Sequence, residues 1–135
     1  MDLAIHHVSV PVRDLLAASQ FYEGVLGFQR LPRPSFPVAG LWYKVGDRQI
    51  HLVVHPGANF RNGKPVDNDD VHFALNTADF EGAYAHLKLN GYSEDLPGGH
   101  PKRLILKRTG AAGFAQVFFM DPDFNIIEIN TAPFC

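Results

Sequence analysis

The stretch Ile5–Val12, which reads IHHVSVPV, alternates between two kinds of side chain, and a related stretch returns at Val71–Asn76 as VHFALN. A period of two is typical of a β-strand with one apolar face packed against a second layer. Each stretch carries a histidine opposite its continuous apolar face, His7 in the first and His72 in the second. The sequence therefore predicts two related strands that open two similar halves.

The segments that follow these strands are also alike. Asp14 and Asp79 occupy helix N-cap positions, and apolar residues then recur at helical spacing. The helices are expected to end at Gly27 and Gly91, which lie 20 and 19 residues after the strand histidines. This spacing predicts an internal repeat.

Further strands complete each half. The proline-rich Arg30–Gly40 is a loop or an edge segment, and the other expected strands are Leu41–Val45, Gln49–Val54, Leu104–Lys107, Gln116–Met120 and Ile126–Asn130. Each half therefore reads as strand, helix and three strands. Because a half of about 60 residues buries too little surface to be stable on its own, the halves should pack as a pseudo-symmetric pair. We expect an α+β fold and a single domain, 1–135, with modules at about 1–55 and 71–135 and a polar linker, 56–70.

Composition narrows the class of protein. The chain has 135 residues, a formal net charge of -2, seven histidines and one cysteine. The lone Cys135 excludes a disulfide framework and a cysteine-based zinc site. The weak negative charge argues against nucleic-acid or membrane-surface binding, and no apolar run approaches the roughly 20 residues of a membrane span. The first residues also lack the features of a signal peptide, so we expect a soluble, cytoplasmic protein whose partner is a small molecule.

The repeat selects four residues that could bind a metal. His7 and His72 occupy equivalent first strands, while His51 and Glu128 lie on the last strand of their halves. Each of them alone is more simply a hydrogen-bonded or solvent-facing residue, but together they project from the face opposite the helices. A buried carboxylate is costly unless it is paired or metal-bound. Three imidazoles and one carboxylate suit one divalent transition metal, namely zinc, nickel, iron or manganese.

Other side chains on the same face are candidates for contact with substrate. Ser9 lies beside His7, and Trp42 could face the substrate. Gln116 and Phe118 share one face of the penultimate strand, where core packing is an equally good interpretation. His6 lies on the opposite face from His7 and is not expected to bind the metal.

The motifs quoted above resemble the vicinal oxygen chelate superfamily, which includes glyoxalase I, fosfomycin resistance proteins, extradiol dioxygenases and bleomycin resistance proteins. The opening IHHVSVPVRD, the later HFAL and the closing DPDFNIIEI carry the resemblance across essentially the whole chain. It implies paired βαβββ modules that form a cupped mixed sheet, with the metal at the bottom of the cup. By position it assigns His7, His72 and Glu128 as ligands. His51 stands at the fourth position, where glyoxalase I usually has glutamate, and Phe124 replaces a glycine in the closing turn.

The resemblance implies a glyoxalase-I-like lyase or isomerase that chelates two adjacent substrate oxygens. Glu128 would then move the proton, and His51 would serve as a ligand or as a base. An Fe(II) extradiol-type dioxygenase that uses His7, His72 and Glu128 is the alternative. A fosfomycin-resistance-like thiol transferase and a metal-free bleomycin-type binding protein are further alternatives. We also expect a homodimer, in which the ligands come from one chain or from two.

Overall fold

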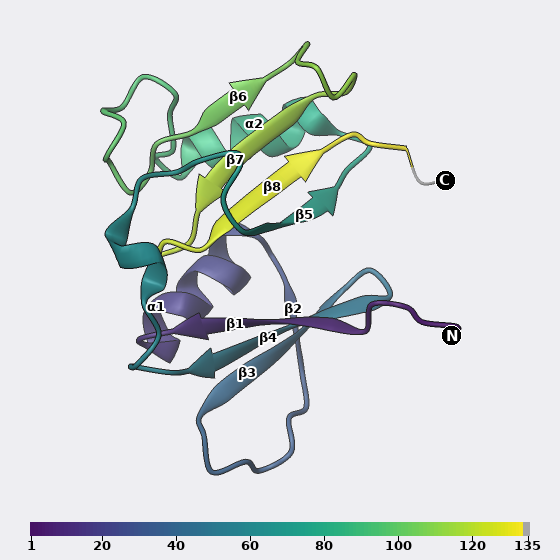
Figure 1. Cartoon of the computed structure of the whole chain (residues 1–135), viewed down its shortest axis with the longest axis vertical. Helices are drawn as coiled ribbons and strands as arrows, with labels where there is room; N and C mark the ends of the chain where they lie inside the picture. Colours follow the sequence, from purple (N-terminus) through teal and green to yellow (C-terminus); the bar gives the residue numbers. More distant parts are fainter. Residues whose placement is uncertain (134–135) are drawn as a thin grey trace. The chain divides into compact units, whose positions relative to one another are not determined.

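The computed structural model describes residues 1–133, so Cys135 lies outside the described residues. The chain forms two compact units. Unit 1 comprises Met1–Phe60, and unit 2 runs from Arg61 to the C-terminus. Each unit contains a four-stranded mixed sheet and a helix, which confirms the α+β class and the predicted repeat (Figure 1).

Unit 1 begins with the predicted strand. Strands β1 and β4 are parallel, β4 and β3 are antiparallel, and β3 and β2 are antiparallel, giving the order β1-β4-β3-β2. The edge strand β2 forms at the start of the proline-rich segment. The elements are β1 (His7–Val12), α1 (Leu15–Ser19), η1 (Gln20–Val25), β2 (Gln29–Leu31), β3 (Gly40–Val45) and β4 (Arg48–Val54).

Unit 2 repeats this arrangement with the order β5-β8-β7-β6, in which β5 and β8 are parallel and the other pairs antiparallel. Because the strand order and the strand directions match those of unit 1, equivalent residues of the repeat occupy equivalent places in the two sheets. The elements are η2 (Phe60–Gly63), β5 (His72–Asn76), α2 (Phe80–Leu89), β6 (Ile105–Lys107), β7 (Gln116–Met120) and β8 (Ile126–Asn130).

Both helices start at the predicted aspartates. The side chain of Asp14 accepts a hydrogen bond from the Leu16 amide at 2.9 Å, and that of Asp79 accepts one from the Gly82 amide at 2.9 Å. These bonds satisfy backbone donors that the helix itself leaves unpaired.

The first helix differs from the predicted single α-helix. After Ser19 it widens into the π-helix η1, whose end is closed by a hydrogen bond from the Leu26 amide to the Phe21 carbonyl at 3.1 Å. The wider turn lets the consecutive residues Phe21 and Tyr22 both be buried, at 4% and 0% exposure. A π-helical turn of this kind is rare and has no clear sequence signal.

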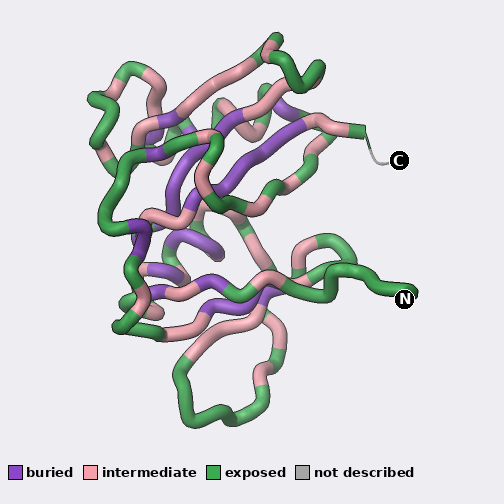
Figure 2. The backbone as a smooth tube through the Cα atoms, in the orientation of Figure 1, coloured by how far each residue is buried: buried purple, intermediate pink, exposed green. Residues whose placement is uncertain are grey.

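The core is more continuous in unit 2 than in unit 1. All five residues of β8 are buried, and Figure 2 shows the buried colour running along β8 and most of β7, whereas the N-terminal segment is exposed. One apolar residue of the expected polar linker also joins this core, because Val66 is buried against Phe118, Met120 and Ile126. The segment between the predicted modules is therefore partly packed onto the second sheet.

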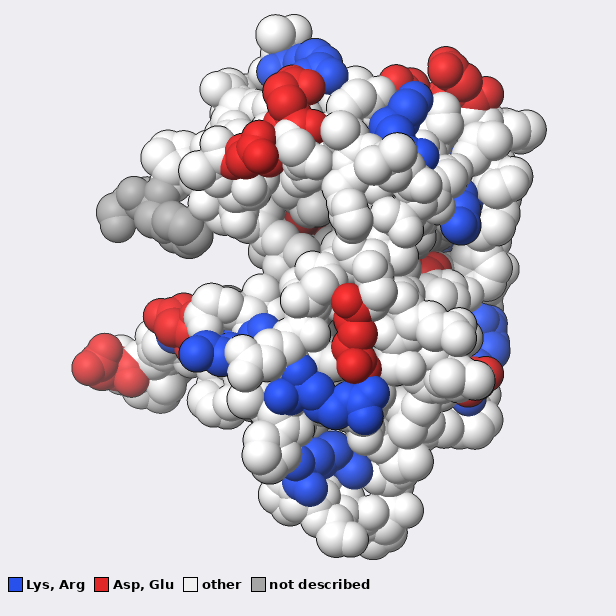
Figure 3. Space-filling view, turned by 180° about the vertical axis from the view of Figure 1, so that it is seen from behind, with Lys and Arg blue, Asp and Glu red and all other residues white. Residues whose placement is uncertain are grey.

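The surface carries both signs of charge. On the side shown in Figure 3, acidic and basic side chains are interspersed, as the nearly balanced composition leads one to expect. Within residues 1–133, no helix has both the length and the apolar character needed to cross a membrane.

Candidate functional site

Strand register in unit 1 places three of the predicted site residues together. Ser9 on β1 and Trp42 on β3 are the direct partners of His51 on β4. Because direct partners across a sheet point to the same face, all three side chains share the face opposite the buried Val10 and Leu52. His7 lies two residues before Ser9 and points the same way.

A stack of three rings occupies this face. The His51 ring is parallel to the Trp42 ring, with centroids 4.2 Å apart and planes at 7°, and it stacks on its other side against His7 at 4.0 Å and 15°. The Gln49 side-chain oxygen lies 2.8 Å from Nε2 of His51. The neutral Gln49 amide and the two flanking rings thus fix the orientation of His51.

The surroundings of His51 hold it in the neutral form. Burial, and then the positive charges that His7, His6 and Arg33 can carry, lower the pKa of His51 to about 4. An imidazole that is neutral at neutral pH keeps a lone pair on one ring nitrogen, which is the form that binds a metal.

The doublet His6–His7 is exposed and its rings are in contact. Their Nδ1 atoms are 3.0 Å apart and the rings meet edge to face at 5.2 Å. His7 lies within β1, whereas His6 precedes the strand. His7 is stacked directly on His51, while the His6 ring lies 6.5 Å from it.

In unit 2, Glu128 lies at the centre of β8 and pairs across the sheet with Ala74 and Phe118. Its side chain is only 8% exposed. One carboxylate oxygen, Oε1, accepts a hydrogen bond from Nε2 of Gln116 at 2.6 Å, and the other, Oε2, lies 3.4 Å from Nε2 of His72. The structure therefore joins Glu128, His72 and Gln116 on one face of the second sheet.

The protonation pattern of His72 is constrained by its second nitrogen. Nδ1 lies 2.7 Å from the backbone oxygen of Asp70, and a carbonyl oxygen only accepts hydrogen bonds, so Nδ1 carries a proton. In neutral His72, Nε2 then presents a lone pair to the Glu128 carboxylate 3.4 Å away. The lone pairs of Nε2 and of the Glu128 carboxylate oxygen repel each other at this distance unless a proton or another cation lies between them.

The remaining predicted residues divide between surface and core. Ser9 is exposed and Trp42 is half-buried on the His51 face. Phe118 is a core residue, 3% exposed, whose ring also meets His72 edge to face at 5.5 Å. Phe124, in the closing turn, takes the left-handed conformation (φ 66°) that glycine adopts more readily.

The four predicted metal ligands thus occur as two pairs, His7 with His51 in unit 1 and His72 with Glu128 in unit 2. Within the described part of the chain, no group of three or more histidine, cysteine, aspartate or glutamate residues is arranged to hold a metal. Each unit taken by itself presents two candidate ligands.

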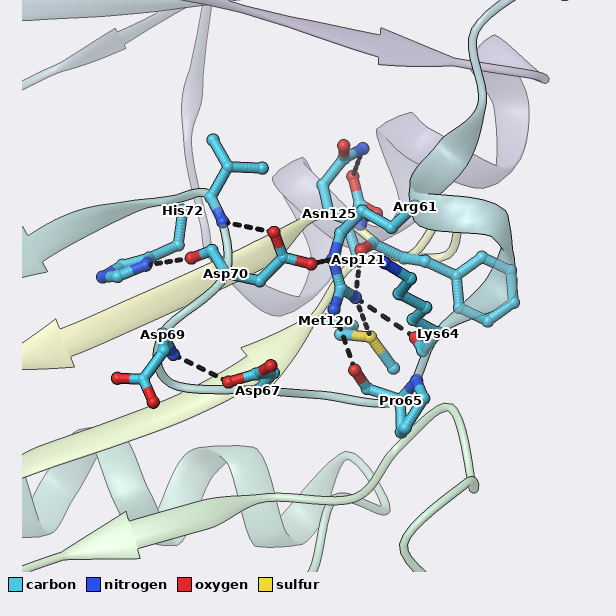
Figure 4. A network of polar contacts seen from close by, with 12 residues as sticks. Arg61, Lys64, Pro65, Asp67, Asp69, Asp70, His72, Met120, Asp121 and Asn125 are labelled. Carbon is cyan, nitrogen blue, oxygen red and sulfur yellow. Dashed lines mark hydrogen bonds and ion pairs between the residues drawn. The ribbon is translucent and has the colours of Figure 1, made fainter.

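Two contacts of these pairs were absent from the sequence prediction. Gln49 follows the same alternation as His51, so the period of two could have placed it on this face. Asp70 and its partner Arg61 lie in the polar segment before β5, where no pattern indicated a role. Figure 4 shows Arg61 and Asp70 with His72.

Solved structures share the fold. A glyoxalase family protein from Enterococcus faecalis is 24% identical, with 94% of this chain and 96% of that chain covered and a TM-score of 0.71. A bleomycin-binding protein solved with bleomycin is 22% identical (98% and 100% covered, TM-score 0.69). A fosfomycin resistance protein from Listeria monocytogenes is 13% identical (100% and 95% covered, TM-score 0.68). At these identities the likeness shows a common fold.

The search of curated proteins gives no match. The family model, in contrast, matches nearly the whole chain, residues 4–129. Together with the two repeated four-stranded sheets, this match shows that the chain belongs to the Glyoxalase/Bleomycin resistance protein/Dioxygenase superfamily.

Proposed function

We propose that the protein is a divalent-metal-dependent enzyme, and that it catalyses a glyoxalase-I-like isomerisation of a small substrate with two adjacent oxygens. The observation that carries the proposal is the His72–Glu128 pair, in which a ring nitrogen and a carboxylate oxygen face each other at 3.4 Å. Because Nδ1 carries the proton, the lone pair of neutral His72 lies on Nε2 and points toward the carboxylate. A divalent cation satisfies both groups at once.

The residues present fit such an ion. His72 and Glu128 supply one nitrogen and one oxygen ligand, and the neutral His51 and neighbouring His7 supply two more nitrogens. Mixed imidazole and carboxylate ligands suit zinc, nickel, iron or manganese better than magnesium or calcium. We propose that one ion draws on both pairs. When bound, the ion would polarise the two substrate oxygens as a Lewis acid.

Glu128 is the residue best suited to move the proton. In the reaction of a hemithioacetal, the carbon that bears sulfur loses a proton and the neighbouring carbonyl carbon gains one, so the product is a thioester isomer and no oxidant is needed. The Gln116 hydrogen bond fixes one oxygen of Glu128, and the other oxygen faces Nε2 of His72. A carboxylate in this position could accept the proton as a general base. Trp42 and Ser9 would line the substrate side of His51.

Two measurements test this proposal. Protein purified without chelators is expected to contain one transition-metal ion per site by elemental analysis, and to form lactoylglutathione from methylglyoxal and glutathione when loaded with zinc or nickel. The variant Glu94→Gln, which changes a carboxylate of unit 2 remote in sequence from the pair, serves as the control. Protein that takes up no metal would instead be the binding protein of the metal-free alternative.

A dioxygenase is the second candidate, and the surroundings of His51 favour it. Nε2 of His51 already contacts Gln49, and the ring is held between Trp42 and His7. If His51 serves only as packing, then His7, His72 and Glu128 remain, which is the two-histidine, one-carboxylate set of Fe(II) oxygenases. The variant His51→Gln should then retain iron binding and catechol-dependent oxygen uptake. Loss of zinc or nickel binding in the same variant supports the four-ligand site.

We also propose a homodimer. The half-exposed Phe36 and Val38, and Ile5 and Val71 next to the edge strands β1 and β5, are apolar side chains in contact with solvent. Edge strands and exposed apolar residues are features that a second copy of a chain commonly covers. Light scattering of the purified protein tests this state, and a monomer at micromolar concentration would contradict it.

A further inference from the structure

The segment before β5 contains an arginine with an unusual environment. Arg61 has a left-handed backbone (φ 52°) and is 9% exposed, although arginine is almost never buried without partners. Its guanidinium donates hydrogen bonds to the backbone oxygens of Lys64, Pro65 and Phe124 at 3.2, 2.9 and 3.1 Å, and contacts the sulfur of Met120 at 3.4 Å (Figure 4). The guanidinium is therefore fixed on several sides.

Another donor of this group, Nε of Arg61, bonds Oδ2 of Asp70 at 3.0 Å. The other oxygen of the same carboxylate accepts the Val71 amide at 2.8 Å. Both oxygens of Asp70 are thus engaged, one by a charged group in a rigid setting and one by the backbone that leads into β5. This double attachment sets the direction of the peptide at residue 70.

The backbone oxygen of Asp70 accepts the hydrogen bond from Nδ1–H of His72, at 2.7 Å. We propose that Arg61 and Asp70 are positioning residues that hold His72 as the Nδ1–H tautomer and direct Nε2 toward Glu128. Hydrogen bonds of this kind, from the second ring nitrogen of a ligating histidine, orient the ring and select its tautomer. The inference rests on the proposed function for its link to a metal, whereas the tautomer itself is a property of the protein without metal.

The neighbouring aspartates show that this arrangement is specific to Asp70. The carboxylate of Asp67 accepts the Asp69 amide at 2.8 Å, and that of Asp69 accepts the Asn68 side chain at 3.1 Å. These contacts are local. The contact with Arg61 is made by Asp70, so Asp69 offers a matched control with the same charge one residue away.

The test compares Asp70→Asn with Asp69→Asn in the full-length protein freed of metal. Arg61 and the Val71 amide bond different oxygens of Asp70, so in asparagine one of these two donors would face the NH₂ group, which is itself a donor. Imidazole ¹⁵N NMR at neutral pH reports which ring nitrogen carries the proton, and His72→Gln assigns the His72 signals. We expect Nδ1–H in the wild-type protein and in Asp69→Asn, and a shift toward Nε2–H in Asp70→Asn. An Nδ1 of His72 that carries no proton in the wild-type protein, or an unchanged protonation of Nδ1 in Asp70→Asn, would overturn the inference.

Zinc binding, measured by competition with a chelator, gives the second readout. Loss of a partner to a ligating histidine typically weakens metal binding by about 10–100-fold, and because Asn keeps part of the network we expect about 10-fold for Asp70→Asn and no change for Asp69→Asn. A wild-type protein that binds no zinc contradicts the proposed function and leaves the NMR result to decide the inference. Equal zinc affinity in both variants, with zinc bound by the wild-type protein, contradicts the inference alone.

A second variant, Arg61→Lys, tests the inference if Asp70→Asn does not fold. Lysine keeps the charge but, as a compact ammonium, cannot reproduce the fixed fork of donors. If this variant folds, as judged by circular dichroism, the His72 tautomer should shift in the same direction as in Asp70→Asn. An unchanged tautomer in a folded Arg61→Lys protein would exclude Arg61 from the positioning role.

Discussion

The two candidate ligand pairs come from equivalent places in the repeat but are held in opposite ways. In unit 1, the candidate ligands His7 and His51 are kept in place mainly by ring stacking, with Trp42 parallel to His51 at 4.2 Å and His7 stacked on it at 4.0 Å. In unit 2, His72 and Glu128 are kept in place by hydrogen bonds, from Gln116 to the carboxylate and from His72 to the Asp70 carbonyl. The single anionic side chain among these four candidates, Glu128, lies in unit 2.

This difference separates two tasks. The His51 ring, stacked between His7 and Trp42, can shift slightly without losing these contacts. The stack presents a flat aromatic surface, which suits contact with substrate. A buried carboxylate with both oxygens engaged has a fixed orientation, which suits charge attraction to a cation and proton transfer. We therefore expect changes in unit 2 to affect chemistry and changes in unit 1 to affect binding. The following predictions test that division.

Glu128→Gln should have the largest effect. The amide has nearly the same shape but neither the negative charge nor the ability to accept a proton, so lactoylglutathione formation should fall by about 10²–10⁴-fold, the usual contribution of a general acid–base group. Steady-state kinetics at saturating zinc measures this loss. The control Glu81→Gln alters an exposed carboxylate paired with Arg108 and should leave the rate unchanged. A Glu128→Gln enzyme with normal activity would remove the distinction between the pairs.

Mixing variants tests whether both pairs serve one ion. His7→Ala and Glu128→Gln proteins, each inactive alone, are unfolded together and refolded as a mixture. If a site combines His7 and His51 of one copy with His72 and Glu128 of another, mixed dimers contain one intact site and part of the activity returns. A mixture of His7→Ala with His51→Ala damages the same pair twice and should stay inactive. No recovery in either mixture would indicate that each site takes both pairs from one chain.

The aromatic neighbours of the two pairs should differ in their contribution to stability. Phe118 is 3% exposed and belongs to the core of unit 2, so Phe118→Ala should lower the free energy of unfolding by about 3–5 kcal/mol. Trp42 is half-buried, and Trp42→Ala should forfeit mainly its stacking on His51, about 0.5–1.5 kcal/mol. Urea unfolding followed by circular dichroism measures both. Equal losses would mean that the unit 1 rings form a core of the same kind.

The smallest effects concern two similar surface clusters, one in each unit. Glu23 accepts hydrogen bonds from Arg30 and Tyr43, which lower its pKa, and Glu94 is bonded by Tyr84 and Lys88 with the same result. A carboxyl whose pKa is lower in the folded state stabilises the fold above its ordinary pKa of 4.5 and loses that stabilisation as the pH falls further.

Because both carboxylates are about one-third exposed, each should contribute less than about 1 kcal/mol. The variants Glu23→Gln and Glu94→Gln should therefore be slightly less stable than the wild-type protein at pH 7 and should show a flatter loss of stability between pH 5 and pH 3. Urea midpoints across this range measure the effect. A difference from wild type that grows as the pH falls would contradict the assigned direction of the pKa.

Much of the fold was predictable because it depends on local alternation. The period of two at β1 and β5, together with Asp14 and Asp79 as N-caps, located the repeat, and the repeat in turn selected His7 and His72. The same reasoning placed His51 and Glu128 on the last strands. These features follow from side chains that report on their own face of a strand, so no tertiary information was needed.

What the sequence did not reveal depends on contacts between distant residues. Nothing near Val66 distinguishes it from its polar neighbours, and its burial follows from Phe118, Met120 and Ile126. Arg61 resembles a surface arginine until residues 120 and 124 are placed beside it. The widening of the first helix at η1 likewise follows from the packing of Phe21 and Tyr22 and not from helix propensity.

The left-handed residues Phe60, Arg61 and Asn62 also bear on how the protein is made. For residues other than glycine this conformation costs roughly 1–2 kcal/mol each, and the Arg61 hydrogen bonds that offset it include one to the Phe124 carbonyl. During synthesis the N-terminal part of the chain emerges first, so residues 60–62 leave the ribosome well before their distant partners at residues 120 and 124. The bonds of Arg61 to Lys64, Pro65 and Asp70 can form early, whereas its contacts with Met120 and Phe124 form only after the chain has been translated past residue 124.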